Sequence, residues 1–145
     1  MEQTYFNRLR IIHLALCAGV LIMGIIFYTM KTAEAKIDTS FSNPMSIVGL
    51  SLSALVIVSS FMYTKKIKEI LETDTFEQKK LKYQTAYILM LALIEGPVIF
   101  NLIVFQLTQN LFHLVIAGAL VFNMISKFPN KTHIAMLLNC TTEEL

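Results

Sequence analysis

The chain has 145 residues, of which 55% are apolar and only 15% are charged, whereas an average soluble domain has roughly 25% charged residues. Its mean hydropathy is +0.62. These values exclude a disordered chain, a collagen and a disulfide scaffold. They also argue against a soluble enzyme, because so small a domain cannot bury that much apolar surface. The net charge is +2, and the basic residues do not form a long basic block, so nucleic-acid binding is not expected.

Four apolar segments are expected to cross a membrane as helices, because backbone polar groups in lipid must bond within their own segment. The first is too long for a cleaved signal peptide and is interpreted as a retained span. Pro44 suits the start of a helix, and Phe128-Pro129 ends one. The predicted spans are 11–30, 44–63, 83–107 and 111–126.

The remaining segments complete a single all-α transmembrane domain over residues 1–145. A charged loop covers 64–82, and its residues 65–71 are expected to continue the second helix. A turn at 108–110 joins the last two spans. The tail, 128–145, holds a short helix through Leu138, which is interpreted as a surface helix more readily than as a partner-binding module.

Lys and Arg residues give the orientation, because they are concentrated in cytoplasmic segments. With four spans, Lys31 and Lys36 lie on one side of the membrane. The other ten Lys and Arg residues lie on the opposite side: Arg8, Arg10, Lys65, Lys66, Lys68, Lys79, Lys80, Lys82, Lys127 and Lys131. Both termini are therefore predicted to be cytoplasmic, in a bacterial inner membrane. The two cysteines, Cys17 and Cys140, are not expected to form a disulfide, since one lies in a span and one in the tail.

Glu95 lies at the midpoint of the third span and is the main candidate functional residue. A carboxylate at that depth costs about 2.5–3.5 kcal/mol, and intramembrane acids are usually functional. We expect Glu95 to hold a proton or a cation. The alternative is a protonated, structural Glu that donates one interhelical hydrogen bond. Gly96 and Pro97 follow directly: Pro97 leaves a backbone carbonyl without its helical donor, and Gly96 lets another helix or an ion approach.

Depth along the antiparallel spans suggests which residues accompany Glu95. At about 1.5 Å per residue, Ser51, Ser53 and Asn123 fall near its level and are its candidate partners. His13 and His113 lie closer to the two membrane surfaces and are predicted to be interfacial hydrogen-bonding residues. Asn101 and Gln106 are interpreted as contacts between helices or as polar steps toward the outer face.

Small residues predict where helices pack closely. The candidates are Ala15 and Gly19 in the first span, Gly49 in the second, Gly96 beside Pro97 in the third, and Gly118 in the fourth. The pattern does not decide whether the packing partner is the same chain or a second copy. No spacing of Cys, His, Asp or Glu predicts a metal site, and no motif predicts a cofactor or a nucleophile–base pair, so the chain is not expected to be an enzyme.

The third span resembles the second helix of the proteolipid c subunit of rotary F- and V-type ATP synthases. The shared pattern is LAL-x-E-x-x-x-I-x-x-L-x-V, carried here by Leu91, Ala92, Leu93, Glu95, Ile99, Leu102 and Val104 after a Lys-rich loop. The resemblance implies that Glu95 binds a proton or sodium and that copies form a ring. It covers roughly residues 45–107. The second span lacks the dense glycines of that family, and spans one and four have no counterpart in a two-helix c subunit.

The whole chain is also similar to uncharacterised small four-span membrane proteins of Bacteroidota, a resemblance that implies no function. Two hypotheses follow. In the first, the chain is a c-subunit-like homo-oligomer in membrane lipid, and ring formation is one arrangement open to it. In the second, it is a non-transporting membrane scaffold with a structural, protonated Glu95, whose loop and tail dock a cytoplasmic or membrane protein.

Overall fold

The structure, a computed structural model, describes residues 3–31, 34–39, 43–70 and 73–141, so short parts of the predicted segments 64–82 and 128–145 lie outside the described residues. The described chain is helical apart from its connections and one isolated pairing between Lys36 and Asn110. The helices are α1 (Gln3–Thr29), α2 (Pro44–Ser53), α3 (Leu55–Lys68), α4 (Phe76–Thr108), α5 (Leu111–Ser126) and α6 (Lys131–Leu138).

Three stretches of helix are long and apolar enough to cross a membrane, namely Tyr5–Thr29, Pro44–Lys68 and Phe76–Thr108. Helices α5 and α6 together would make a fourth, bent by 63° at the break between them. The predicted all-α class is confirmed for the described residues, which include three or four stretches long and apolar enough to cross a membrane. Alone, the 16 residues of α5 extend about 24 Å, less than the hydrocarbon thickness of a typical bilayer.

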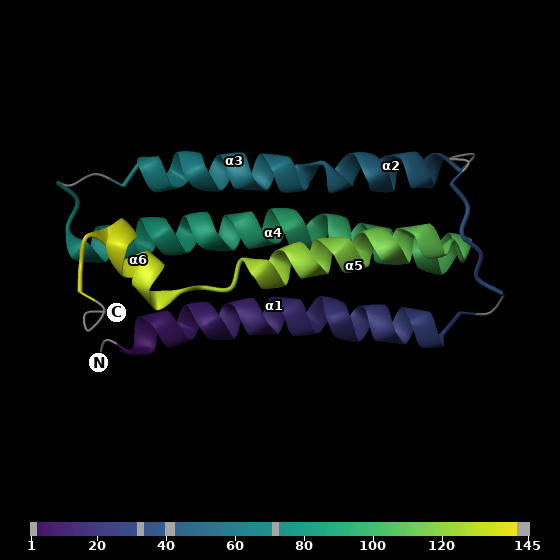
Figure 1. Cartoon of the computed structure of the whole chain (residues 1–145), viewed down its shortest axis with the longest axis horizontal. Coiled ribbons are helices and arrows are strands. Elements are labelled where there is room, and N and C mark those ends of the chain that lie inside the picture. The colour runs from purple at the N-terminus through teal and green to yellow at the C-terminus, as the bar shows by residue number, and fades with distance from the viewer. Residues whose placement is uncertain (1–2, 32–33, 40–42, 71–72, 142–145) are drawn as a thin grey trace.

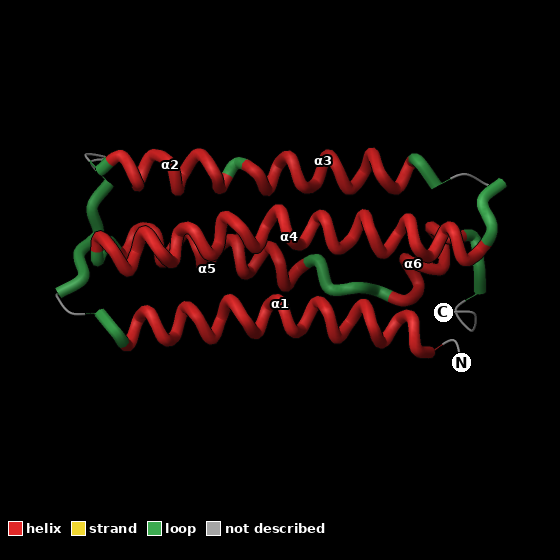
Figure 2. Tube along the Cα trace, turned by 180° about the vertical axis from the view of Figure 1, so that it is seen from behind, coloured by secondary structure: helices red, strands yellow, loops and turns green. Residues whose placement is uncertain are grey.

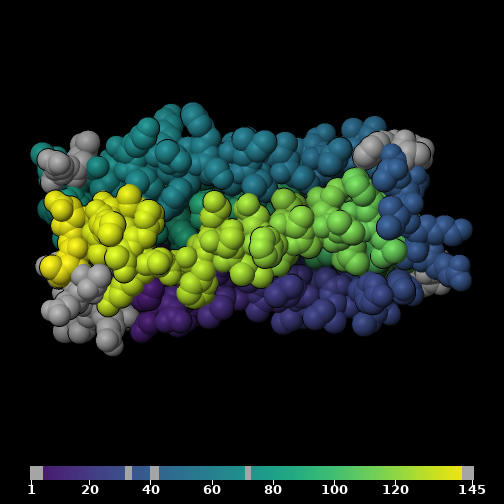
Figure 3. Space-filling model, in the orientation of Figure 1, coloured from purple at the N-terminus to yellow at the C-terminus, as the bar shows by residue number. Residues whose placement is uncertain are grey.

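Helix α4 is the centre of the bundle and contacts every other helix. Figure 1 shows α2 and α3 along one side, α1 along the other, and α4 and α5 between them. The reverse view in Figure 2 shows the same three rows. In Figure 3, α5 and α6 cover the middle of the front face. The start of α1, the α3–α4 connection and α6 share one end of the bundle, which we call the charged end.

Helix α4 begins seven residues earlier than the predicted third span. Thr75 and Gln78 form a capping box at its start, in which each side chain bonds the other's backbone N–H. A capping box satisfies donors that the first helical turn would otherwise leave free. The helix continues through Pro97 to Thr108, so its 33 residues extend about 50 Å and reach beyond the apolar core of a bilayer.

The predicted second span is interrupted by one turn at Ala54, which divides it into α2 and α3. Two serines just before the break bond back to the helix: Ser51 Oγ donates to Ile47 O, and Ser53 Oγ donates to Gly49 O, both over 2.8 Å. Serine hydroxyls bonded to the preceding turn compete with the backbone ladder and bend helices. The break is absent from the predicted span 44–63, in which both serines are candidate partners of Glu95.

Asn110 closes the end of the bundle opposite the charged end. Its side chain accepts from Phe112 N, which caps α5. The same side chain accepts from Asp38 N over 3.0 Å and donates to Asp38 O over 2.7 Å. One residue therefore starts a helix and holds the α1–α2 connection against the turn between α4 and α5.

Replacing Asn110 should lower the free energy of unfolding. Asn110→Ala removes a helix cap and two hydrogen bonds to the connection, so we expect a loss of about 2 kcal/mol. Asn43→Ala is the matched control, because Asn43 caps α2, and a cap alone is worth about 1 kcal/mol. Equilibrium unfolding in detergent micelles, followed by circular dichroism, measures both. Equal losses in the two variants would mean that the bonds to Asp38 contribute nothing.

Candidate functional site

Glu95 lies on α4, half-buried, at the edge of the surface that α4 leaves uncovered. Its carboxyl makes no hydrogen bond or ion pair with any residue that the structure describes. The neighbouring group with which it interacts electrostatically is the thiol of Cys17 on α1. The central residue of the predicted site is therefore left without a polar partner inside the described chain.

Among the described residues, no hydrogen bond joins Glu95 to its predicted partners Ser51, Ser53 and Asn123. Ser51 bonds only its own helix, while Ser53 accepts from Asn101 Nδ2 over 3.0 Å. Asn123 Oδ1 is buried and has no partner among the described residues. Depth in a membrane does not determine which face of a helix a residue occupies. Asn101 follows Glu95 by six residues, so the two side chains lie about 120° apart around the axis of α4. Helix α2 packs on the face of Asn101.

Asn101 is the centre of a buried network that joins α2, α4 and α5. Its Nδ2 donates to Gly49 O over 3.2 Å, to Ser53 Oγ and, within α4, to Pro97 O over 2.9 Å. Two of these acceptors are backbone carbonyls, which can only accept, so the orientation of the amide is fixed. Its Oδ1 lies 2.9 Å from His113 Nδ1 on α5. The interpretation of Asn101 as a contact between helices is confirmed.

His113 completes this network from α5. Because an amide oxygen can only accept, Nδ1 of His113 carries the proton of the bond to Asn101. The other ring nitrogen, Nε2, lies 2.8 Å from the hydroxyl of Ser46 on α2. His113 is fully buried, as is Asn101. It forms hydrogen bonds as predicted, and it does so while buried between helices near the start of α5.

A second buried contact joins α1, α4 and the segment after α5. His13 Nδ1 of α1 lies 2.6 Å from the hydroxyl of Tyr87 on α4, and that hydroxyl donates to Lys127 O over 3.1 Å. The edge of the Phe128 ring also packs against His13, with ring centroids 5.2 Å apart. The prediction of a hydrogen bond from His13 is confirmed. Nothing in the sequence singles out Tyr87, whose spacing is that of an ordinary core residue.

The small residues fall into two groups. Gly49 is buried against the Asn101 network, where an added Cβ would lie 3.1 Å from Asn101 Oδ1, and Pro97 is buried on α4. In contrast, a Cβ at Gly19, Gly96 or Gly118 would meet nothing within 4 Å, and Ala15 is exposed. Close packing at these four positions therefore requires something other than the described residues of this chain.

Gly118 borders an apolar groove of about 320 Å³ between α1, α4 and α5. Val20 and Gly24 of α1, Leu102 of α4 and Val121 of α5 form much of its lining. Its walls carry no charged side chain, so it offers an acyl chain or an apolar helix a surface but offers an ion no ligand. Within the described residues, no group of three or more His, Cys, Asp or Glu is arranged to hold a metal ion.

Gln106 is the second residue predicted as a contact between helices, but its side-chain oxygen forms no hydrogen bond with another helix among the described residues. Its Oε1 is buried without a partner among the described residues. A pairing across the α4–α5 turn could have been anticipated from the sequence, since a short turn makes neighbouring helices antiparallel. The spacing does not say which of Asn101 and Gln106 faces His113, and the structure selects Asn101.

Comparisons of the chain with protein-family models, with curated proteins and with solved structures return no match. The resemblance to c subunits therefore depends on the residues of α4 alone.

Adding a methyl group at Gly49 should destabilise the bundle. In Gly49→Ala the new Cβ presses on the amide of Asn101 and the ring of His113, both buried and hydrogen-bonded, and overpacking of this kind costs about 1–3 kcal/mol. Gly118→Ala is the matched control, because open space surrounds that position and alanine favours a helix. Thermal unfolding in detergent should show a lower midpoint only for Gly49→Ala. An unchanged midpoint would mean that Asn101 and His113 can shift to accommodate the methyl group without a loss of stability.

Proposed function

We propose that the chain is a four-span integral membrane protein of the bacterial inner membrane that self-associates and holds a proton or a cation at Glu95. The observation that carries this proposal is the half-buried carboxyl of Glu95, which has no hydrogen bond or ion pair among the described residues. A charged carboxylate in lipid is costly. Its compensation must come from a proton, from a bound cation or from a second chain.

The contrast with Asn101 and His113 supports this proposal. Those two polar side chains also lie within the apolar helices, and both are satisfied by hydrogen bonds inside the chain. Gln106 and Asn123 each have a buried oxygen without a partner among the described residues, but these amides carry no ionisable group. Glu95 is the ionisable side chain of α4 that lies within the apolar part of the bundle and has no such hydrogen bond in the described chain. This distinction favours a functional carboxyl over a structural one.

The uncovered surface of α4 gives the proposed contact between copies. Its exposed residues recur along one stripe, with Ala92 and Gly96 at the centre and Glu95 beside them. Small residues four apart let a second helix approach closely, which is a common way for helices to associate in membranes. A ring of copies, as the c-subunit resemblance implies, would place one Glu95 at each boundary between subunits.

The distribution of basic residues supports both termini on the cytoplasmic side. The ten Lys and Arg residues assigned to that side belong to α1, the α3–α4 region and the segment from Lys127 to Lys131, all toward the charged end. Lys31 and Lys36 follow α1 at the opposite end. Positive residues are retained on the cytoplasmic side during insertion.

The alternative, a scaffold that docks a partner through its tail, has less support. Ile134, Ala135 and Leu138 of α6 are buried in the same cluster as Leu9 and Tyr87, so the apolar face of this helix is already covered by its own chain.

Carbodiimide labelling tests the carboxyl directly. We expect dicyclohexylcarbodiimide to add to Glu95 faster at low pH, because it reacts with the protonated form, and we expect sodium to slow the reaction if the site takes that ion. Intact-protein mass spectrometry measures the adduct. Glu95→Gln should abolish labelling, whereas Glu77→Gln, on the exposed first turn of α4, should leave it unchanged. Labelling that is independent of both pH and sodium would favour the structural alternative.

Native mass spectrometry in mild detergent tests self-association. We expect an oligomer for the natural chain and a shift toward the monomer for Gly96→Ala, whose methyl group thickens the surface beside Glu95. The thermal midpoint of the monomer should stay unchanged, because no described residue outside that turn of α4 lies within 4 Å of the new Cβ. Gly118→Ala, equally open but on α5, should leave the oligomer intact. A monomer at all concentrations would remove the proposed contact.

A further inference from the structure

The charged end holds a cavity of about 390 Å³ between α3, α4 and the segment that joins α5 to α6. We call it the link cavity. Its volume lies within the range of small-ligand sites. Its lining residues include Ser60 and Thr64 of α3, Tyr83 and Tyr87 of α4, Lys127 of the joining segment and His133 of α6.

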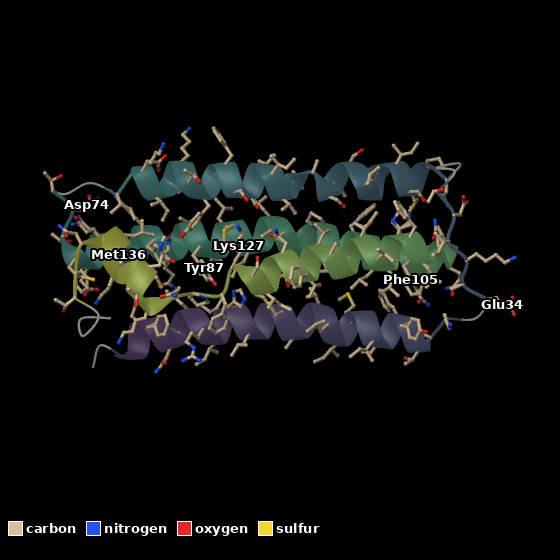
Figure 4. The ribbon with its side chains drawn as sticks, viewed as in Figure 1. Glu34, Asp74, Tyr87, Phe105, Lys127 and Met136 are labelled. Carbon is tan, nitrogen blue, oxygen red and sulfur yellow. The ribbon has the colours of Figure 1, made fainter. Side chains whose placement is uncertain are left out.

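The cavity exists because α5 stops early and its continuation is held in place. Helix α5 ends at Ser126, and the chain resumes as α6 at Lys131 after a bend of 63°. The hydroxyl of Tyr87 fixes Lys127 O, and Asn130 caps α6 by accepting from Thr132 N and His133 N. Figure 4 labels Tyr87 and Lys127 at the place where the chain leaves α5. The joining segment is therefore anchored at both of its ends.

The lining of the link cavity is suited to an anion. None of its lining residues is an Asp or a Glu, and Lys127 and His133 are among them. In the part of the chain that the structure describes, the side chains of Ser60, Lys127 and His133 form no hydrogen bond or ion pair. Three side chains that can donate thus face one cavity without a partner. Phosphate oxygens accept strong hydrogen bonds from such donors, especially when the donor is a cation.

The position of the cavity indicates where that anion comes from. In α3, Thr64 directly precedes Lys65 and Lys66 in the last turns of the helix. Lys127 is the first charged residue after the apolar α5. Tyr63, Tyr83 and Tyr87 also line the cavity. Tyrosines and lysines gather where the apolar core of a bilayer meets its headgroups. Basic pockets between helices at this level bind anionic lipid headgroups.

We propose that the link cavity binds the phosphate headgroup of an anionic phospholipid, with Lys127 as its cation and Ser60 and His133 as further donors. The lipid would then occupy the space left by the short α5 and hold α3, α4 and α6 together. This inference does not depend on the role of Glu95. It requires only that the helices cross a membrane with the charged end at a headgroup layer.

Titration of the purified full-length protein with phosphatidylglycerol, followed by native mass spectrometry, tests the proposal. We expect one tightly held lipid per chain and weaker binding of phosphatidylcholine, which has a phosphate but no net charge. Lys127→Gln should weaken phosphatidylglycerol binding about tenfold, as expected for the loss of one charge-assisted hydrogen bond. Lys131→Gln is the matched control, because Lys131 lies four residues away and does not line the cavity.

Two further variants and a soluble phosphate distinguish the possible results. Ser60→Ala, at an exposed position of α3, should weaken binding even if Lys127→Gln fails to fold, and Glu95→Gln should leave binding unchanged. Glycerol phosphate, which lacks acyl chains, should bind far more weakly than the lipid. Equal affinities of the Lys127→Gln and Lys131→Gln variants would overturn the proposal in favour of general attraction to surface charge. Tight binding of glycerol phosphate would instead assign the cavity to a soluble phosphate.

Discussion

The side-chain amide of Asn101 is the contact on which the arrangement of the helices depends. It bonds α2 through Gly49 and Ser53, α5 through His113, and its own helix through Pro97. In apolar surroundings each of these groups is costly to leave unpaired. A slip of any one helix would break several bonds at once. The network therefore fixes the register of α2, α4 and α5, and the absence of a side chain at Gly49 leaves the room that it needs.

The same cost of an unpaired polar group separates Glu95 from Asn101 and His113. Asn101 and His113 turn toward helices of their own chain, whereas Glu95 lies at the edge of the one uncovered stripe of α4. A carboxyl in that position is compensated only from outside the bundle or by a proton. The proposed binding of a proton or cation at Glu95 and the proposed contact between copies therefore concern the same surface of α4.

The two ends of the bundle are built differently. Asn110 closes one end by binding the α1–α2 connection directly to the α4–α5 turn. At the charged end, α5 stops short, α6 follows after a bend of 63°, and the joining segment lines a cavity. His13 and Tyr87 hold that segment, so α1 contributes to the cavity without lining it.

The sequence by itself determined the helical class, the apolar segments, the end of α5 before Phe128-Pro129 and the short tail helix. Hydropathy and helix-breaking residues act locally, so each can be read from its own segment. It also identified Glu95 as exceptional and Asn101 as a contact between helices. Only the tertiary structure decided which faces meet: it paired Asn101 with His113 and Ser53, and it paired His13 with Tyr87. It forms no hydrogen bond between Glu95 and Ser51, Ser53 or Asn123 among the described residues. Depth in a membrane follows from counting residues, but the facing of a side chain depends on how helices rotate and pack, which no single segment encodes.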